Sequence, residues 1–230
     1  MVNVEFTPSV AEVLAAVATV PCISSVSDAT SKSLMTSNPE IVRAIERSIP
    51  LMTRAKALAT LMHGLTSIAI AGTHGKTTTS SMATVAFQAC GVDPSFAIGG
   101  MINTAGTNAH LGSGDAFVAE ADESDGSFVE YHPFGAIVTN VEHDHVDFFA
   151  TPESVEQAFR DFVATIKPGG FLTYCADDEG AVALSSSTTS VDLVSYGVNE
   201  SADLHIDQIE LLTMGSRARA LWKGKSVGHI

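Results

Sequence analysis

Basic residues are scarce in this chain of 230 residues, which has 12 Lys and Arg against 26 Asp and Glu and a net charge of -14. Nucleic acids and anionic membranes attract proteins that carry an excess of positive charge. The composition therefore argues against both as partners. A phosphate ligand would have to be held by a local site, because the overall field repels it.

Cysteine is also scarce, and long apolar runs are absent. The three cysteines, Cys22, Cys90 and Cys175, lie far apart and form no Cys-x-x-Cys pair, a pattern typical of free thiols in a reducing compartment. No apolar stretch approaches the length of a transmembrane helix, and the N-terminus lacks the layout of a signal peptide. With 45% hydrophobic residues, the chain can build a buried core. We expect a cytoplasmic globular protein.

A Gly-x-Gly-x-x-Gly dinucleotide fingerprint is missing as well, but another glycine-punctuated turn is present. A short apolar strand is predicted at 68–71, and an amphipathic helix is predicted to run to Cys90 and to end at Gly91. The turn between them reads Gly72, Thr73, His74, Gly75, Lys76, Thr77 and Thr78. Glycines let backbone N–H groups approach phosphate oxygens, and a helix N-terminus favours negative charge. The stretch therefore predicts a site for a nucleoside triphosphate.

Two side chains of this turn have the chemistry that such a ligand needs. Lys76 would reach the terminal phosphates, and the Thr77 hydroxyl would bind a magnesium ion. The match to Gly-x-x-x-x-Gly-Lys-Ser/Thr is partial, because Ile70 stands at the first glycine position. An ordinary strand-to-helix turn is the alternative. We expect the lysine of such a surface loop to contribute little packing.

Carboxylates gather at the end of the predicted strand 116–119. Glu120 is followed by Asp122, Glu123 and Asp125, and in open α/β sheets the carboxyl ends of strands are where ligands bind. A magnesium ion bound to ATP would neutralise part of this charge, which favours a metal-binding role for Glu120. For the other three carboxylates, helix capping and solvent exposure are equally good explanations.

A second polar cluster follows the predicted strand 136–139 and contains His143 and His145. Because alternate residues of an extended segment point to opposite faces, only one of these histidines is expected to reach a shared site. A hydrogen-bonded structural histidine is the alternative. Polar clusters at successive strand ends add weight to the functional interpretation.

The Gly, Asn and Thr-rich stretch 99–112 is longer than a simple turn requires, so it is predicted to be a loop that contacts a ligand. Asn103, Thr104 and Asn108 are its candidate substrate contacts. A surface loop without function is the alternative.

The remaining periodicity predicts helices and strands in alternation. The helices are expected at 7–20, 38–48, 53–64, 151–166 and 178–184, the strands at 95–98, 171–175, 191–196 and 204–211, and a hairpin at 217–222 and 226–230. The expected fold class is α/β, a P-loop-type, mostly parallel sheet flanked by helices, with a few antiparallel strands near the C-terminus.

Four strings in order resemble the Mur ligase family, most closely its alanine-adding branch. They lie at 71–79, 108–112, 120–128 and 139–147. The resemblance covers roughly residue 38 onward, and the family's shorter Gly-Thr-x-Gly-Lys-Thr loop accounts for Ile70. It implies that residues 1–64 are a remnant of an N-terminal UDP-sugar-binding domain and that residues 65–230 are a central ATP-binding domain truncated at its C-terminus.

The resemblance also implies an activity, namely ATP-dependent ligation of L-alanine to UDP-N-acetylmuramate through an acyl phosphate, in peptidoglycan precursor synthesis. By motif position, Lys76 would hold the terminal phosphates, Thr77 and Glu120 would bind one Mg2+, and His145 would belong to a second metal site. Some members of the family use a carbamylated lysine after the histidine motif. No lysine lies between Lys76 and Lys167, which fits the alanine-adding branch.

Three other interpretations remain open at this point. A related ligase attaches a recycled tripeptide to the same sugar nucleotide, although Ser124 and the string 108–112 favour the alanine-adding branch. A nucleotide-binding module without catalysis agrees with the incomplete set of domains. A regulatory P-loop switch would explain Lys76 and Thr77 but gives no reason for the clusters around Glu120 and His145.

Overall fold

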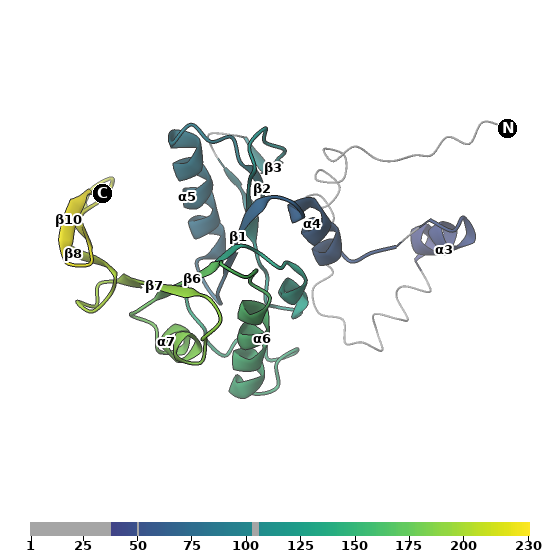
Figure 1. Ribbon diagram of the computed structural model, residues 1–230. Coiled ribbons are helices and arrows are strands. Elements are labelled where there is room, and N and C mark those ends of the chain that lie inside the picture. The colour runs from purple at the N-terminus through teal and green to yellow at the C-terminus, as the bar shows by residue number, and fades with distance from the viewer. Residues whose placement is uncertain (1–37, 50, 103–105) are drawn as a thin grey trace.

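The computed structural model describes residues 38–49, 51–102 and 106–230 (Figure 1). The helix expected at 7–20 and the candidate contacts Asn103 and Thr104 lie outside these ranges. The described strands form one sheet in the order β10-β9-β8-β7-β6-β5-β1-β4-β2-β3. Their bounds are β1 (Thr66–Ala71), β2 (Ser95–Ile102), β3 (Thr107–His110), β4 (Ala116–Glu120), β5 (Gly135–Val138), β6 (Phe171–Cys175), β7 (Asp192–Gly197), β8 (Leu204–Leu212), β9 (Gly215–Trp222) and β10 (Lys225–His229).

The described α-helices occur where the periodicity predicts them, whereas a short 3-10 helix at Ser127–Glu130 was not predicted. The helices are α3 (Pro39–Glu46), α4 (Arg54–Met62), α5 (Lys76–Ala89), the 3-10 helix η1 (Ser127–Glu130), α6 (Pro152–Ala164) and α7 (Glu179–Ser186). Their ends follow the expected capping residues. Thr53 caps α4, and Thr151 forms a capping box with Ser154 at the start of α6. Past the end of α5, the Gly91 N–H donates to Gln88 O at 3.0 Å with φ at +80°, the left-handed backbone that glycine adopts without strain.

Strand direction confirms the expected mostly parallel sheet. β1 pairs in parallel with β4 and β5, and β2, β6 and β7 continue the parallel arrangement outward. β8, β9 and β10 form an antiparallel meander at one edge, so the expected C-terminal hairpin is confirmed. This meander joins the parallel part through only two β7–β8 residue pairs, Tyr196 with Leu204 and Gly197 with His205.

The stretch 99–112 is not the long loop that its composition predicts. β2 continues to Ile102, and β3 turns back to pair with it, Phe96 opposite His110 and Ala97 opposite Ala109. Two of the glycines that suggested a loop, Gly99 and Gly100, lie inside β2, where the side chains of Glu120 and Thr77 approach the backbone closely. The prediction was wrong because glycine there provides space rather than a turn.

Helices cover both faces of the parallel strands, so the core has two parts (Figure 1). On one face, Ala83 and Phe87 of α5 pack against Ile70, Phe96 and Val118. On the other face, α4, η1, α6 and α7 pack around residues that include Phe117, Phe128, Phe159 and Phe162. A parallel sheet covered in this way buries its strands, which leaves the strand ends as the places where polar groups can meet solvent.

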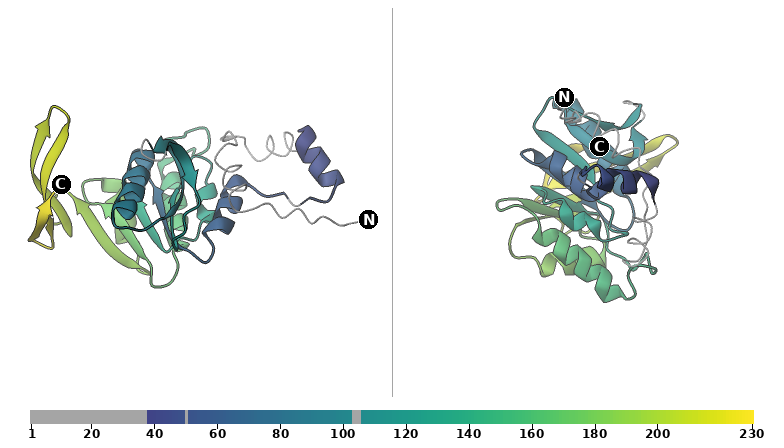
Figure 2. Two further views of the ribbon diagram at one scale, coloured as in Figure 1. Left: turned by 90° about the horizontal axis from the view of Figure 1, so that it is seen from above. Right: turned by 90° about the vertical axis from the view of Figure 1, so that its right-hand side faces the viewer.

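Two parts extend away from this covered core. Figure 2 shows that the β8–β10 meander projects beyond the helices at one end, and that α3 stands apart at the other. In the described ranges, no helix combines the length and the apolar character needed to cross a membrane.

Candidate functional site

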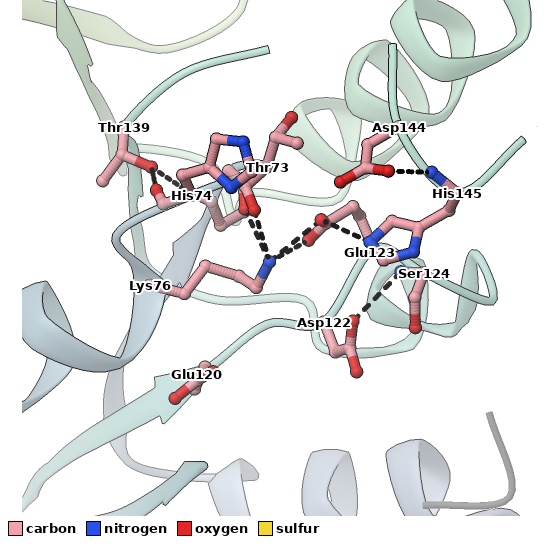
Figure 3. A network of polar contacts seen from close by, with 12 residues as sticks. Thr73, His74, Lys76, Glu120, Asp122, Glu123, Ser124, Thr139, Asp144 and His145 are labelled. Carbon is pink, nitrogen blue, oxygen red and sulfur yellow. Dashed lines mark hydrogen bonds and ion pairs between the residues drawn. The ribbon is translucent and has the colours of Figure 1, made fainter. Parts of the chain in front are cut away.

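Three chain segments meet beyond the carboxyl ends of β1, β4 and β5 and surround a cavity of about 440 Å³. They are the turn at 72–75, the carboxylate segment at 120–125 and the segment 139–148 (Figure 3). Because β4 and β5 flank β1 and both pair with it in parallel, the C-terminal ends of all three strands lie at the same edge of the sheet. The residues that line the cavity are Thr73, Lys76, Glu120, Asp122, Ser124, Asp144, His145, Asp147 and Phe148.

The turn after β1 depends on two glycines. Gly72 has φ at +139°, and a Cβ there would collide with the side chain of Thr139. Gly75 has φ at +84° and occupies the N-cap position of α5. Both conformations suit only glycine without strain. The turn therefore lies directly against the end of β5, close to the second polar cluster.

The backbone donors of this turn divide into two groups. The Thr73 N–H donates to Asn140 O at 3.3 Å, and the His74 N–H donates to Asn140 Oδ1 at 2.8 Å. These two donors are thus committed to the end of β5. At the start of α5, no side chain caps the helix, and the first helical N–H groups have no intrahelical acceptor. The backbone N–H groups of Lys76, Thr77 and Thr78 are therefore available to an anion. The side chain of Thr78 is exposed in the same turn.

The Lys76 ammonium group is held inside the site. Its Nζ donates to Gly72 O at 2.7 Å, to Thr73 O at 3.3 Å and to Glu123 Oε1 at 2.9 Å. Only 13% of the Lys76 side chain and 2% of the Glu123 side chain are exposed. The expectation that the lysine is a surface residue with little packing was therefore wrong, and so was solvent exposure for Glu123. The carboxylate is buried because a cation from another segment compensates its charge, which no local pattern reveals.

Burial raises the pKa of Glu123 above its ordinary value, and the hydrogen bond from Lys76 counteracts that rise. Close by, Asp144 has a lowered pKa, chiefly because the His145 N–H donates to Asp144 Oδ1 at 2.7 Å. The pKa values of the two carboxylates are therefore shifted in opposite directions. Asp122 and Asp125 accept the N–H groups of Ser124 and Ser127 at 3.0 and 2.9 Å, two residues further along the chain, as in Asx turns. Neither side chain caps a helix, because η1 has Gly126 at its N-cap position and no side-chain cap.

Thr77 and Glu120 form an oxygen-rich pair beside the helix start. The Thr77 hydroxyl donates to Glu120 Oε1 at 3.0 Å, and the Gly99 N–H donates to Oε2 at 2.7 Å. A Cβ at Gly99 would lie 2.9 Å from Glu120 Oε1, and one at Gly100 would lie 2.7 Å from the Thr77 methyl group. The two glycines of β2 therefore make room for this pair.

Only one of the two histidines lines the cavity, as expected, although the segment that carries them is irregular and not an extended strand. His143 Nε2 lies 3.1 Å from Phe149 O and does not line the cavity, whereas His145 does. His145 has φ at +52°, an uncommon backbone conformation for a residue with a side chain. Its Nε2 lies 3.5 Å from Glu123 Oε1 (Figure 3).

The other candidates lie elsewhere, and several cavity residues were not foreseen. Asn108 belongs to β3 at the sheet edge and does not line the cavity. The sequence analysis assigned no role to Asp144 or Asp147, which lie in the polar cluster after β5, or to Phe148, which directly follows that cluster. Only the residue types at that strand end could have indicated them, because no periodic pattern extends through this irregular segment.

Comparison with known proteins follows the same segments. The family model of the Mur ligase middle domain matches residues 70–228. A UDP-N-acetylmuramate--L-alanine ligase of Rhodococcus jostii (strain RHA1) is 48% identical over 198 residues, which is 84% of this chain and 39% of that protein. The enzyme of the same name from Mycobacterium marinum is 55% identical over 162 residues, 70% of this chain and 33% of that protein. The chain thus spans well under half the length of these relatives.

Solved structures agree with the fold. A UDP-N-acetylmuramate:L-alanyl-gamma-D-glutamyl-meso-diaminopimelate ligase from Neisseria meningitides superposes with a TM-score of 0.72 at 25% identity, covering 84% of this chain and 64% of that one. A UDP-N-acetylmuramate-alanine ligase from Thermotoga maritima gives 0.69 at 25% identity, covering 84% and 43%. Together with the family model, which matches more than half of the chain, they show that this chain belongs to the Mur ligase family and contains its middle domain.

Proposed function

We propose that this chain is the nucleotide-binding part of an ATP-dependent ligase that joins L-alanine to UDP-N-acetylmuramate in peptidoglycan precursor synthesis. The observation that carries the proposal is that one cavity is lined by Lys76, Glu120 and His145 from three separate strand ends, and that the Thr77 hydroxyl donates to Glu120. The two relatives with 48% and 55% identity both carry the name of the alanine ligase.

In the proposed reaction, a carboxylate oxygen of the sugar nucleotide attacks the terminal phosphorus of ATP, and ADP leaves. The amino group of alanine then attacks the acyl carbon, phosphate leaves and the nitrogen loses a proton. The first step brings two anions together, so positive charge around the transferred group is the main requirement. The Lys76 ammonium and the uncapped start of α5 provide it from the protein side.

The residues present fit magnesium. Mg2+ is usually bound through one or two carboxylates, with phosphates and water completing its shell. The Thr77 hydroxyl and the Glu120 carboxylate offer oxygen ligands 3.0 Å apart at the cavity, and we assign one ion to them and a second to His145. In the described ranges no group of three or more His, Cys, Asp and Glu residues is placed to hold a metal ion, so the nucleotide and water would have to supply the remaining ligands. When bound, the metal would neutralise phosphate charge.

We retain as proposals the cytoplasmic location, where ATP is available, and the division of the chain into residues 1–64 and 65–230. Residues of α4, among them Leu58 and Met62, pack in the same core cluster as Phe159 and Phe162. The helix before β1 thus supports the nucleotide-binding part directly, whichever domain it belongs to in the longer relatives.

Calorimetry with ADP, in the presence and absence of Mg2+, tests the nucleotide and metal assignments. We expect the wild type to bind MgADP more tightly than ADP, and Thr77→Val to lose that gain because it removes a metal-binding hydroxyl but keeps the side-chain shape. Thr79→Val, the same substitution half a helical turn further along α5, is the matched control and should retain the gain. Absence of binding by folded wild type would contradict the proposal.

The substrate assignment needs a second measurement, because the tripeptide ligase structure superposes slightly better than the alanine ligase structure, with TM-scores of 0.72 and 0.69. Phosphate release is measured with MgATP, UDP-N-acetylmuramate and either L-alanine or L-alanyl-gamma-D-glutamyl-meso-diaminopimelate. Faster release with alanine supports the alanine ligase, and faster release with the tripeptide supports its relative. Tight binding without release in either mixture would support a nucleotide-binding module.

A further inference from the structure

Glu123 is the only charged side chain that is buried in the described part of the chain, with 2% exposure. It lies between Lys76 and His145 (Figure 3), and it is not among the residues that line the cavity. A buried carboxylate without compensation is costly. Its position therefore needs an explanation beyond capping.

The first partner of Glu123 is Lys76. Its Nζ lies 2.9 Å from Oε1 and 2.8 Å from Oε2, so both carboxylate oxygens face one ammonium group. The other contacts of Nζ are with the uncharged carbonyls of Gly72 and Thr73. When a phosphate approaches, the carbonyl contacts are the easier ones to exchange, because releasing Glu123 would leave a buried charge unpaired.

The second partner is His145, whose Nε2 lies 3.5 Å from Glu123 Oε1. The backbone of this histidine is fixed independently. Its N–H donates to Asp144 Oδ1 at 2.7 Å, and its carbonyl accepts the N–H groups of Phe148 and Phe149 at 2.8 and 2.9 Å. A carboxylate beside one imidazole nitrogen favours the proton on that nitrogen and leaves the lone pair on the other.

From these contacts we propose that Glu123 is a positioning residue that holds Lys76 and His145 in fixed orientations around the cavity. One carboxylate thereby links the phosphate-binding lysine to the histidine of the neighbouring strand end. The inference rests on the proposed function, since it concerns how that site is prepared for MgATP. A carboxylate that instead competes with phosphate for Lys76 would make the same contacts in the free protein, but its removal would have the opposite effect on nucleotide affinity.

Binding of MgADP to Glu123→Gln and Glu123→Asp distinguishes the two. Gln lacks the charge, and Asp is too short to reach both partners, so we expect both variants to bind roughly tenfold to hundredfold more weakly, the usual loss for groups that orient metal ligands. Asp125→Asn is the matched control, because it loses one charge in the same segment while its side-chain oxygen can still accept the Ser127 N–H. It should bind within about twofold of the wild type. Unchanged or tighter binding by Glu123→Gln would overturn the proposal.

A measurement on the wild type keeps the inference testable if the variants do not fold. Nitrogen-15 NMR of His145 at a pH where the ring is neutral should show the proton on Nε2, the signal being assigned by its loss in His145→Asn. A proton on Nδ1 would overturn the proposal, because Nε2 could not then donate to Glu123. In folded Glu123→Gln we expect the two tautomers to mix, whereas Asp125→Asn should leave them unchanged.

These results also separate this inference from the proposed function. If the wild type binds no MgADP but His145 carries its proton on Nε2, the nucleotide proposal fails and the positioning contact stands. If the wild type binds MgADP and Glu123→Gln binds as well as it does, the positioning proposal fails alone.

Discussion

The parallel centre of the sheet and the β8–β10 meander belong to one sheet but differ in what surrounds them. In β4, the residues Ala116 to Ala119 are all buried, whereas the last five residues of β8 are exposed. Helices cover the centre on both faces, so its polar residues are confined to the strand ends, where they meet around the cavity. In the meander, polar residues are not confined to the strand ends. Burial by helices therefore stabilises the centre of the sheet and also gathers its polar side chains at one site.

Two ion pairs make the same comparison at the level of side chains. Arg219 contacts Asp207 through both Nε and a terminal nitrogen, at 2.8 and 2.5 Å, with 32% and 30% of the side chains exposed. Lys76 and Glu123 are similarly close but almost fully buried. Water compensates a broken pair at the meander and cannot do so at the centre. Geometry alone would rank these pairs as equals.

The largest expected effect comes from the centre. Phe162 is fully buried and stacks on Phe128 with ring centroids 4.8 Å apart. We expect Phe162→Ala to lower the free energy of unfolding by about 3–5 kcal/mol, through lost apolar burial and the cavity left behind. Urea denaturation measures it. Ile209→Ala, at a meander residue with 52% exposure, is the control. An equal loss of stability there would contradict the inference that burial by helices distinguishes the centre from the meander.

Next in size is the loss of one partner of the buried pair. Lys76→Met leaves Glu123 buried and uncompensated, so we expect a loss of about 3 kcal/mol of stability. Arg219→Met at the exposed pair should shift the urea midpoint far less, because water solvates the remaining Asp207.

The double variant Lys76→Met, Glu123→Gln is the control for this prediction. It removes both charges, and most of the lost stability should return. If the double variant is as unstable as the single one, packing of the lysine stem rather than the unpaired carboxylate is responsible.

The sequence predicted the sheet and the position of the site at its strand ends well, because the patterns that indicate strands and their ends are local. Apolar runs followed by Gly72, by Glu120 and by Asn140 mark three strand ends, and parallel pairing brings such ends together. Helix starts such as those at Thr53 and Thr151 were predicted equally well, because the N-cap residue is adjacent in sequence to the helical turn that it stabilises.

What the sequence could not predict depends on partners distant in the chain. Solvent exposure was one of the explanations left open for Glu123, because its partner Lys76 lies 47 residues away and no local pattern indicates it. The glycines of β2 suggested a loop, although they accommodate Thr77 and Glu120 from other elements. The residue type shows that a position requires space or carries a charge, but only the fold shows which neighbouring side chain fills that space or pairs with that charge.

A smaller effect is expected from pH, with opposite signs in the two regions. Burial raises the pKa of Glu123 above its ordinary 4.5, so the folded state holds its proton more tightly than the unfolded state. The stability of the wild type relative to Glu123→Gln should therefore fall as pH rises above 4.5. Urea denaturation of both proteins from about pH 4 to pH 8 measures this difference.

Asp203, at the junction of β7 and the meander, should behave in the opposite way. Its pKa is lowered below the ordinary 3.8, chiefly by the N–H of Ser195. The advantage of the wild type over Asp203→Asn should be present above 3.8 and lost as pH falls through the lowered pKa. If both pairs of proteins changed in the same direction with pH, burial would not be what separates the two regions.

The smallest effect on stability is expected at the end of the meander, where Leu211 is 85% exposed and Met214 is 93% exposed. Neither side chain loses contact with water on folding, so Leu211→Gln and Met214→Gln should change the free energy of unfolding by less than about 0.5 kcal/mol. Urea denaturation at several protein concentrations tests this. A loss greater than about 1 kcal/mol that grows with concentration would mean that copies of the chain cover these residues in solution. In that case the meander would gain by association the burial that the centre obtains from its own helices.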